Sequence, residues 1–279
     1  MRRLIFTLFV LTSTVAHTQD IIYTKSDSLF VTRTLEKHSR NKREKGDLLL
    51  DIAHEFLEHR YVAGTLEKEG EPLVISTSEV DCTTMVEQAL ALTLTLRNGK
   101  NDFKTFTEKL EAIRYRKGKR QGYRDRLHYV SMWIADSAKQ SFIEEVSTGK
   151  HRKHDTIEIN FMSRHPASYK LLKDNHALTA EIADLEQKES GRIITYIPKN
   201  ELWRGAKELN IEEGDILVLT TNIKGLDAVH MGIAFCAGDE VRLLHASSSS
   251  GKVQKESRSL YEYQKNKKNQ TGIRVFRLK

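Results

Sequence analysis

A cysteine at the start of a helical stretch is the first candidate for chemistry in this sequence. Cys82 follows Asp81 and precedes a run, Thr84 to Leu96, that lacks Gly and Pro and is apolar around most of its circumference. Such a run predicts a buried helix. Asp81 is a good N-cap residue, and Thr84 with Glu87 has the spacing of a capping box one turn later. Because helix N-termini favour anions, we expect a lowered pKa for the Cys82 thiol and a role as nucleophile.

Two histidines lie on neighbouring strands of a predicted hairpin. In the strand 229–236, alternation places His230 on the same face as Gly232 and Ala234. Both neighbours are small, so we expect that face to be open. His245 follows on the next strand and becomes a diagonal neighbour of His230 if residues 238 and 239 form the turn. The two imidazoles can then touch, and a base held by a third polar group is what nucleophilic catalysis requires.

The same hairpin register bears on the only other cysteine, Cys236. A two-residue turn pairs Cys236 with Val241, six residues and about 20 Å along the strand from His230. A disulfide needs α-carbons within roughly 7 Å, so a Cys82 beside His230 cannot reach Cys236. The alternatives are a Cys82–Cys236 disulfide or an inert core thiol, with histidines satisfied by the backbone.

Length and composition indicate one large globular domain. The chain has 279 residues, of which 39% are hydrophobic, and a formal net charge of +7. Residues 1–16 have a basic start, an apolar run and small residues before Ala16, the layout of a secretory signal peptide. We therefore expect an exported, periplasmic protein with no transmembrane segment, a mature domain at 17–279 and a net charge of +5 once Arg2 and Arg3 are removed.

Several kinds of site are disfavoured. His54 and His59 lie five residues apart rather than four, so they do not form a zinc helix. The serine run 247–250 lacks the Gly-x-Ser-x-Gly elbow, and no Gly-rich phosphate loop is present. The basic segments 116–126, 151–154 and 265–268 lack interleaved aromatic residues, so we interpret them as solvated loops and expect no nucleic-acid partner.

The pattern along the chain predicts an α+β fold, with helices first and an antiparallel sheet last. An accessory segment at about 115–200 is inserted between them. The predicted helices are 45–60, 84–96, 102–114 and 177–189, and the predicted strands are 157–162, 192–197, 215–221, 229–236, 241–246 and 273–278.

Taken together, these residues resemble a known family. Asp-Cys-Thr-Thr (81–84) opening a buried helix, Gly-Asp (214–215), His-Met-Gly-Ile (230–233) and His-Ala-Ser (245–247) resemble the NlpC-type papain-like cell-wall peptidases. Tyr-Val-Ala-Gly-Thr-Leu (61–66) and Arg-Leu-His-Tyr (126–129), followed by Trp133, are similar to the branch that acts as N-acetylmuramoyl-L-alanine amidase. Met85 departs from that branch, which usually carries an aromatic residue there.

The resemblance implies a papain-like fold and a cysteine amidase that acts on peptidoglycan or muropeptides without metal or organic cofactor. Cys82 would be the nucleophile, His230 the general base and acid, and His245 the group that orients His230. The substrate-binding residues would be Tyr61, Asp81, Arg126, His128, Tyr129, Trp133 and Ser247. We expect a monomer.

Two other functions remain open from the sequence. The superfamily pattern also permits an endopeptidase that cleaves the stem peptide after D-glutamate. A non-catalytic murein-binding protein with an inert Cys82 is the alternative outside enzymes.

Overall fold

The computed structural model describes residues 21–40, 45–147 and 149–279. The predicted signal peptide, residues 1–16, lies outside these ranges. Within them, no helix is both long and apolar enough to cross a membrane.

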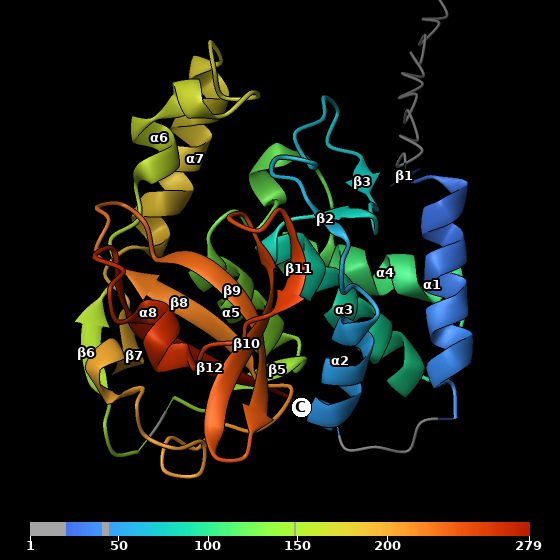
Figure 1. The fold of residues 1–279 in the computed structure, drawn as a ribbon. Coiled ribbons are helices and arrows are strands. Elements are labelled where there is room, and N and C mark those ends of the chain that lie inside the picture. Colours follow the sequence, from blue (N-terminus) through green and yellow to red (C-terminus); the bar gives the residue numbers. More distant parts are fainter. Residues whose placement is uncertain (1–20, 41–44, 148) are drawn as a thin grey trace, which may run out of the picture.

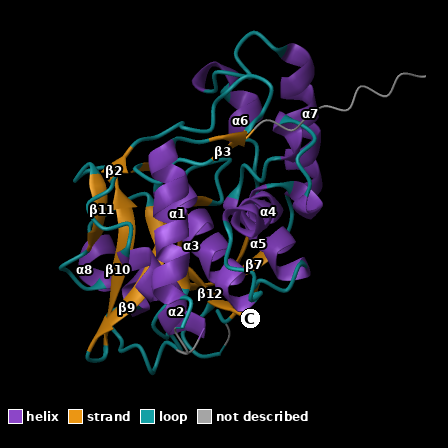
Figure 2. Cartoon of the chain, turned by 90° about the vertical axis from the view of Figure 1, so that its right-hand side faces the viewer, coloured by secondary structure: helices purple, strands orange, loops and turns teal. Residues whose placement is uncertain are grey.

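One side of the molecule is a layer of helices around a buried central helix. α3 begins at Cys82, and its side chains are buried from Thr84 through Thr95, as its apolar composition predicts. Figure 2 shows α1 to α4 on one side of the main sheet and α8 on the other. The helices are α1 (Lys25–His38), α2 (Lys45–His54), α3 (Cys82–Arg97), α4 (Phe103–Arg114), α5 (Val130–Lys139), α6 (Phe161–Arg164), α7 (His176–Glu189) and α8 (Leu260–Gln264). Short 3-10 turns lie at η1 (Arg116–Gly118), η2 (Tyr123–Asp125), η3 (Pro166–Ser168) and η4 (Lys199–Glu201).

A large mixed sheet forms the second layer (Figure 1). Its strand order in the described chain is β4-β2-β11-β10-β9-β8-β12-β7-β6, with β5 also paired to β12. The pairs are antiparallel except for β2 with β4, so the predicted antiparallel sheet is mixed at this edge. The strands are β2 (Arg60–Tyr61), β4 (Glu79–Val80), β5 (Ile143–Glu145), β6 (Lys153–Thr156), β7 (Ile193–Pro198), β8 (Ile216–Thr221), β9 (Ala228–Ala237), β10 (Glu240–Ser247), β11 (Lys252–Lys255) and β12 (Gln270–Leu278). A separate parallel pair joins β1 (Ile21–Ile22) to β3 (Leu73–Val74).

Both faces of strand β9 are packed. Met231, Ile233 and Phe235 lie in the core under the helices, as alternation predicts. The expectation of an open face at Gly232 and Ala234 is wrong, because Ala234 is fully buried in a second core on the opposite side of the sheet. A Cβ atom on Gly232 would come 2.6 Å from the carbonyl oxygen of Leu244. The glycine therefore permits close approach of β10 rather than leaving room for a ligand.

Most predicted elements are confirmed, with shifts at their ends. The helix predicted to end at Arg60 ends at His54, and the chain then turns into β2. The strand predicted at 157–162 is wrong, because Phe161–Arg164 is helical and Ile159 forms only an isolated bridge to Gly225. The backbone N–H groups of Met162 and Ser163 instead point to the carboxylate of Glu186, at 3.1 and 3.2 Å. An anion at this helix start favours the turn over a strand.

The middle segment, 115–200, contributes to more than one part of the fold. β5 and β7 pair with β12, so these stretches belong to the main sheet. α6 and α7 stand beyond the sheet edge in Figure 1. Met162 of α6 and Tyr169, which lies between the two helices in the chain, line a cavity with Cys82 at the start of α3.

Candidate active site

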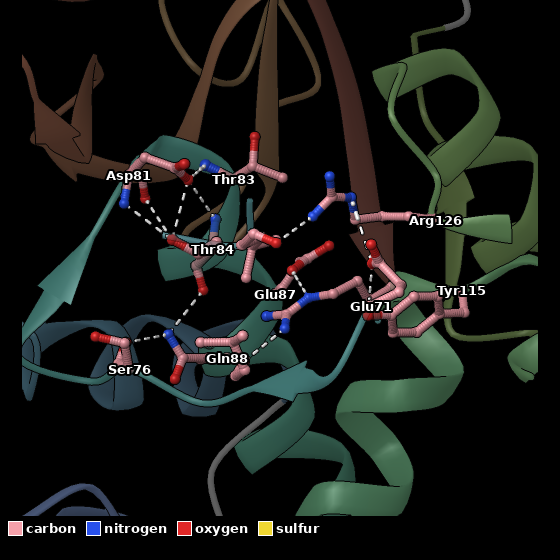
Figure 3. Close-up of polar contacts among 12 residues, drawn as sticks. Glu71, Ser76, Asp81, Thr83, Thr84, Glu87, Gln88, Tyr115 and Arg126 are labelled. Carbon is pink, nitrogen blue, oxygen red and sulfur yellow. Dashed lines mark hydrogen bonds and ion pairs between the residues drawn. The ribbon is translucent and has the colours of Figure 1, made fainter. Parts of the chain in front are cut away.

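The nucleophile candidate lies at the first position of a well-capped helix. The Asp81 side chain accepts hydrogen bonds from the backbone N–H groups of Thr83 and Thr84, at 3.0 and 2.8 Å. The Thr84 hydroxyl in turn accepts from the Asp81 N–H at 2.9 Å, which completes a capping box (Figure 3). The box therefore joins Asp81 and Thr84, and not Thr84 and Glu87 as the spacing suggested. Cys82 is fixed at the helix mouth.

Glu87 forms an ion pair and does not take part in the helix cap. It forms a fully buried ion pair with Arg114, at 2.7 Å, and Arg114 also donates to the Val74 carbonyl. The next residue of α3, Gln88, donates to the Ser76 carbonyl at 3.0 Å (Figure 3). These bonds attach the helix that carries Cys82 to the segment 73–76.

His230 and His245 meet as the hairpin register predicts. Val241 pairs with Cys236, and residues 238 and 239 form the turn. His230 Nε2 lies 2.6 Å from His245 Nδ1, and the two rings are nearly perpendicular at 83°. His245 is fully buried, so this contact is shielded from solvent.

Cys82 and His230 line the same cavity, of about 200 Å³. The Met231 backbone N–H donates a hydrogen bond to the Cys82 sulfur. Because His245 already engages His230 Nε2, the nitrogen left for the thiol is His230 Nδ1. The other lining residues are Thr83, His128, Tyr129, Val130, Met162, Tyr169, Leu226, Asp227, Ala228, Val229 and Met231.

Neither cysteine forms a disulfide. Cys82 and Cys236 are both free, so the disulfide alternative is wrong. Cys236 lies near the far end of β9, where its backbone N–H donates to Glu213.

The pKa of the Cys82 thiol differs from the lowered value that its place at a helix N-terminus predicts. Burial, with a further contribution from Asp81, raises the pKa of the Cys82 thiol to about 11. The pKa of His230 is lowered to about 3, mainly by burial and further by His245 and Lys267. The predicted lowering of the thiol pKa is therefore wrong, because desolvation outweighs the helix terminus. Near neutral pH the pair consists of a thiol and a neutral imidazole.

Three of the predicted substrate-binding residues are close to Cys82. His128 and Tyr129 line its cavity. His128 Nε2 contacts the Tyr123 carbonyl at 2.7 Å, and the Tyr129 hydroxyl donates to Glu186 at 2.6 Å, so both side chains are held in place. Tyr61 is half-buried, and burial together with the neighbouring Cys82 raises the pKa of its phenol. It is therefore protonated at neutral pH and able to donate.

The other four predicted substrate-binding residues do not line the Cys82 cavity. Trp133 is 1% exposed and packs in the core, so its ring has no face open to a sugar. Arg126 is buried against Glu67, Glu71 and the Leu66 carbonyl. The Asp81 carboxylate caps α3 by accepting from the Thr83 and Thr84 N–H groups. Ser247 is the last residue of β10, and its hydroxyl contacts Ser249 and accepts from the Ser250 N–H in the turn that follows.

Asp227 is the main cavity residue that the sequence reasoning missed. It lines the Cys82 cavity, and its carboxylate accepts a hydrogen bond from the Ser131 N–H at the start of α5. Burial raises its pKa. The sequence does contain a signal for this residue. Asp227 directly precedes strand β9 and lies three residues before His230. Leu226 and Asp227 also line a second cavity of about 370 Å³, together with residues of β6, β7 and β8.

Comparison with known proteins identifies the family. Residues 51–273 match the family model described as AmiA-like, N-acetylmuramoyl-L-alanine amidase-like. The chain belongs to this family. It is accordingly an amidase-like hydrolase with a peptidoglycan-related function. No curated protein matches the chain.

Several solved structures are similar to this chain. A crystal structure of an N-acetylmuramoyl-L-alanine amidase from Bacteroides uniformis ATCC 8492 is 40% identical, with a TM-score of 0.80 over 84% of this chain and 99% of that one. A protein from Bacteroides fragilis, provisionally described as a xylanase, is 39% identical, with a TM-score of 0.75 over 82% of this chain and 100% of that one. Protein LPG0564 from Legionella pneumophila str. Philadelphia 1 is 21% identical, with a TM-score of 0.69 over 91% and 94%, and shares the fold.

Proposed function

We propose that this protein is a cysteine amidase that hydrolyses the amide between the lactyl group of N-acetylmuramic acid and L-alanine in cell-wall fragments. The observation that carries the proposal is the placement of Cys82 and His230 in one cavity, with His230 Nε2 held 2.6 Å from His245. Family membership and the amidase from Bacteroides uniformis supply the substrate class. We place the protein in the NlpC-type papain-like superfamily on the same set of residues.

The first half of the reaction forms a thioester. His230 Nδ1 takes the thiol proton as the Cys82 sulfur attacks the amide carbonyl, because both groups start neutral. The Cys82 backbone N–H is at the first helical position, where no helix carbonyl can accept it, and it is free to stabilise the oxyanion. The protonated Tyr61 hydroxyl is a second candidate donor. The carbon–nitrogen bond then breaks, and the alanine nitrogen leaves with the proton from His230.

The second half releases the sugar product. His230 Nδ1 takes a proton from water, and the resulting hydroxide attacks the thioester carbonyl. The carbon–sulfur bond breaks, the muramic carboxylate leaves, and Cys82 regains its proton from His230. His245 keeps the imidazole of His230 oriented throughout.

The decisive experiment is mass spectrometry of disaccharide-tetrapeptide digests. We expect release of an intact peptide that begins with L-alanine. A sugar that still carries L-Ala-D-Glu would show the endopeptidase instead. Binding of the fragment without any cleavage would show the non-catalytic murein-binding protein.

Cysteine variants give the matched control for this digest. C82S should lower the rate by roughly a thousandfold or more, because it removes the nucleophile. C236S should cleave at the wild-type rate, since Cys236 is not among the residues lining the Cys82 cavity. Equal activity of C82S and wild-type protein would exclude the cysteine mechanism.

We also propose that the protein is exported to the periplasm, on the basis of residues 1–16, and acts as a monomer. Fractionation of cells that express the full chain, compared with a variant lacking residues 1–16, tests export. Light scattering on the purified mature chain tests the oligomeric state.

A further inference from the structure

The histidine behind the catalytic pair has an unpaired nitrogen. His245 is fully buried, and its Nδ1 contacts His230 Nε2 at 2.6 Å. Its other nitrogen, Nε2, is buried and has no hydrogen-bond partner within the described part of the chain. A buried polar atom in this condition calls for a physical explanation.

The proposed reaction requires one particular pair of tautomers. His230 Nδ1 can accept the Cys82 proton only if it is bare, so His230 must carry its proton on Nε2 and donate it to His245 Nδ1. His245 must then carry its own proton on Nε2. In the opposite arrangement, His245 Nδ1–H donates to His230 Nε2, and His230 Nδ1 is already protonated and cannot act as a base. Both arrangements share the same short contact, so another group has to select between them.

Tyr263 on α8 is placed to make that selection. The rings of Tyr263 and His245 are in T-shaped contact, with centroids 5.4 Å apart and planes at 79°. An aromatic face is negative, so it accommodates a buried N–H and repels a bare nitrogen lone pair. Figure 2 shows α8 on the side of the sheet away from α1 to α4. Tyr263 therefore approaches His245 from outside the substrate cavity.

Charged groups around Tyr263 hold its ring in place. The Lys267 ammonium lies 3.3 Å from the ring centroid, and the Arg258 guanidinium lies 5.4 Å from it. Arg258 is itself fixed by two bonds to the Glu256 carboxylate, at 3.0 and 2.9 Å. Lys267 and Arg258 disfavour a positive charge on His245 and Glu256 favours one, while burial keeps the imidazole neutral.

We propose that Tyr263 is a positioning residue whose ring faces the Nε2–H of His245 and thereby fixes the tautomer that leaves His230 Nδ1 free to accept the Cys82 proton. This inference rests on the proposed amidase mechanism. It assigns the role to the aromatic ring and not to the hydroxyl.

The direct test is the tautomeric state of the two histidines, read by long-range proton–nitrogen NMR correlations of protein with ¹⁵N-labelled histidine. Signals are assigned with H230Q and H245Q. We expect both histidines as Nε2–H tautomers in the wild type and in Y263F. In Y263L we expect the Nδ1–H tautomers of both to predominate. Tyr261, on the same short helix, supplies the control, and Y261L should leave both tautomers unchanged.

Activity on the disaccharide-tetrapeptide gives the second measurement. Y263L should lower kcat roughly tenfold to a hundredfold with little change in KM, and Y263F should restore it. Unchanged tautomers and unchanged kcat in Y263L would overturn the inference, as would an equal loss in Y263F. If the wild-type protein releases no product, the proposed function fails, but the NMR comparison still decides the role of Tyr263.

Discussion

Burial, more than position at a helix N-terminus, sets the pKa of the Cys82 thiol. A helix N-terminus lowers a thiol pKa, yet the Cys82 thiol pKa is raised to about 11 because the group is desolvated and Asp81 lies beside it. The hydrogen bonds from Met231 and Thr83 act in the opposite direction but are smaller. In the proposed mechanism, His230 therefore has to remove the thiol proton during the attack itself.

Alkylation kinetics test this description of Cys82. In a C236S background, the rate of reaction with iodoacetamide should rise about tenfold per pH unit from pH 7 to pH 10, because only the thiolate reacts. No plateau should occur in that range. A plateau reached by pH 8 would show a thiolate that is already formed near neutrality and would contradict the neutral pair. C82S protein reports the reactivity of Cys236 alone.

At the scale of elements, buried polar contacts connect α3, the helix that carries Cys82, to the loops around it. The basic segment 116–126, interpreted from sequence as a solvated loop, turns two of its arginines inward. Arg120 and Arg126 are buried, and Arg120 donates to the Glu71 carbonyl while Arg126 pairs with Glu67 and Glu71. These contacts fix segment 66–71, which follows Tyr61 in the chain. The spacing of basic residues could not reveal partners that lie some 50 residues away in sequence.

Replacing only one partner of the buried Glu87–Arg114 ion pair should destabilise the protein. E87Q leaves the Arg114 charge buried without its carboxylate, and the free energy of unfolding should fall by about 3 to 5 kcal/mol. The E87L/R114L double variant should recover much of this loss. E108Q, at the exposed pair with Lys104, is the control and should change stability by less than about 0.5 kcal/mol. Denaturant unfolding of the four proteins measures these differences, and an E87Q effect as small as that of E108Q would contradict the assignment.

Gly232 should be intolerant of a side chain. A Cβ atom would lie 2.6 Å from the Leu244 carbonyl oxygen and 2.8 Å from a Leu243 methyl group, so β9 and β10 would have to separate. G232A should lower the free energy of unfolding by roughly 1 to 3 kcal/mol and lower activity, because the same separation lengthens the His230–His245 contact. C236A, on the same strand, should be within about 0.5 kcal/mol of wild type. Wild-type stability and activity in G232A would show that the strand spacing is not required.

For the whole molecule, the paired histidines His230 and His245 link stability to pH. The pKa of His230 is lowered to about 3 and that of His245 to about 4, mainly by burial, whereas an unfolded histidine titrates near 6.5. The unfolded chain therefore binds more protons between these values. The contribution to stability is complete above about pH 6.5 and is lost as the pH falls towards 3.

Unfolding measured at several pH values tests this linkage. Between pH 6.5 and 4, each histidine should steepen the fall in free energy of unfolding by roughly 1 kcal/mol per pH unit. The H230Q/H245Q variant should show a shallower dependence than wild type over that range. H154Q/H165Q, which changes two exposed histidines, should keep the wild-type dependence. Equal slopes in all three proteins would mean that His230 and His245 are not protected from protonation.

The sequence by itself determined the elements of the site and their local relations. The apolar run after Asp81 specified a buried helix that begins at Cys82, and strand alternation with a two-residue turn specified that His230 and His245 meet. Both follow from helical and strand periodicity, which act over a few residues. Only the tertiary structure decided that Gly232 admits a neighbouring strand, that Trp133 belongs to the core, and that Asp227 and Tyr263 flank the site. It also decided the pKa of Cys82, since desolvation depends on atoms from distant segments that no local spacing records.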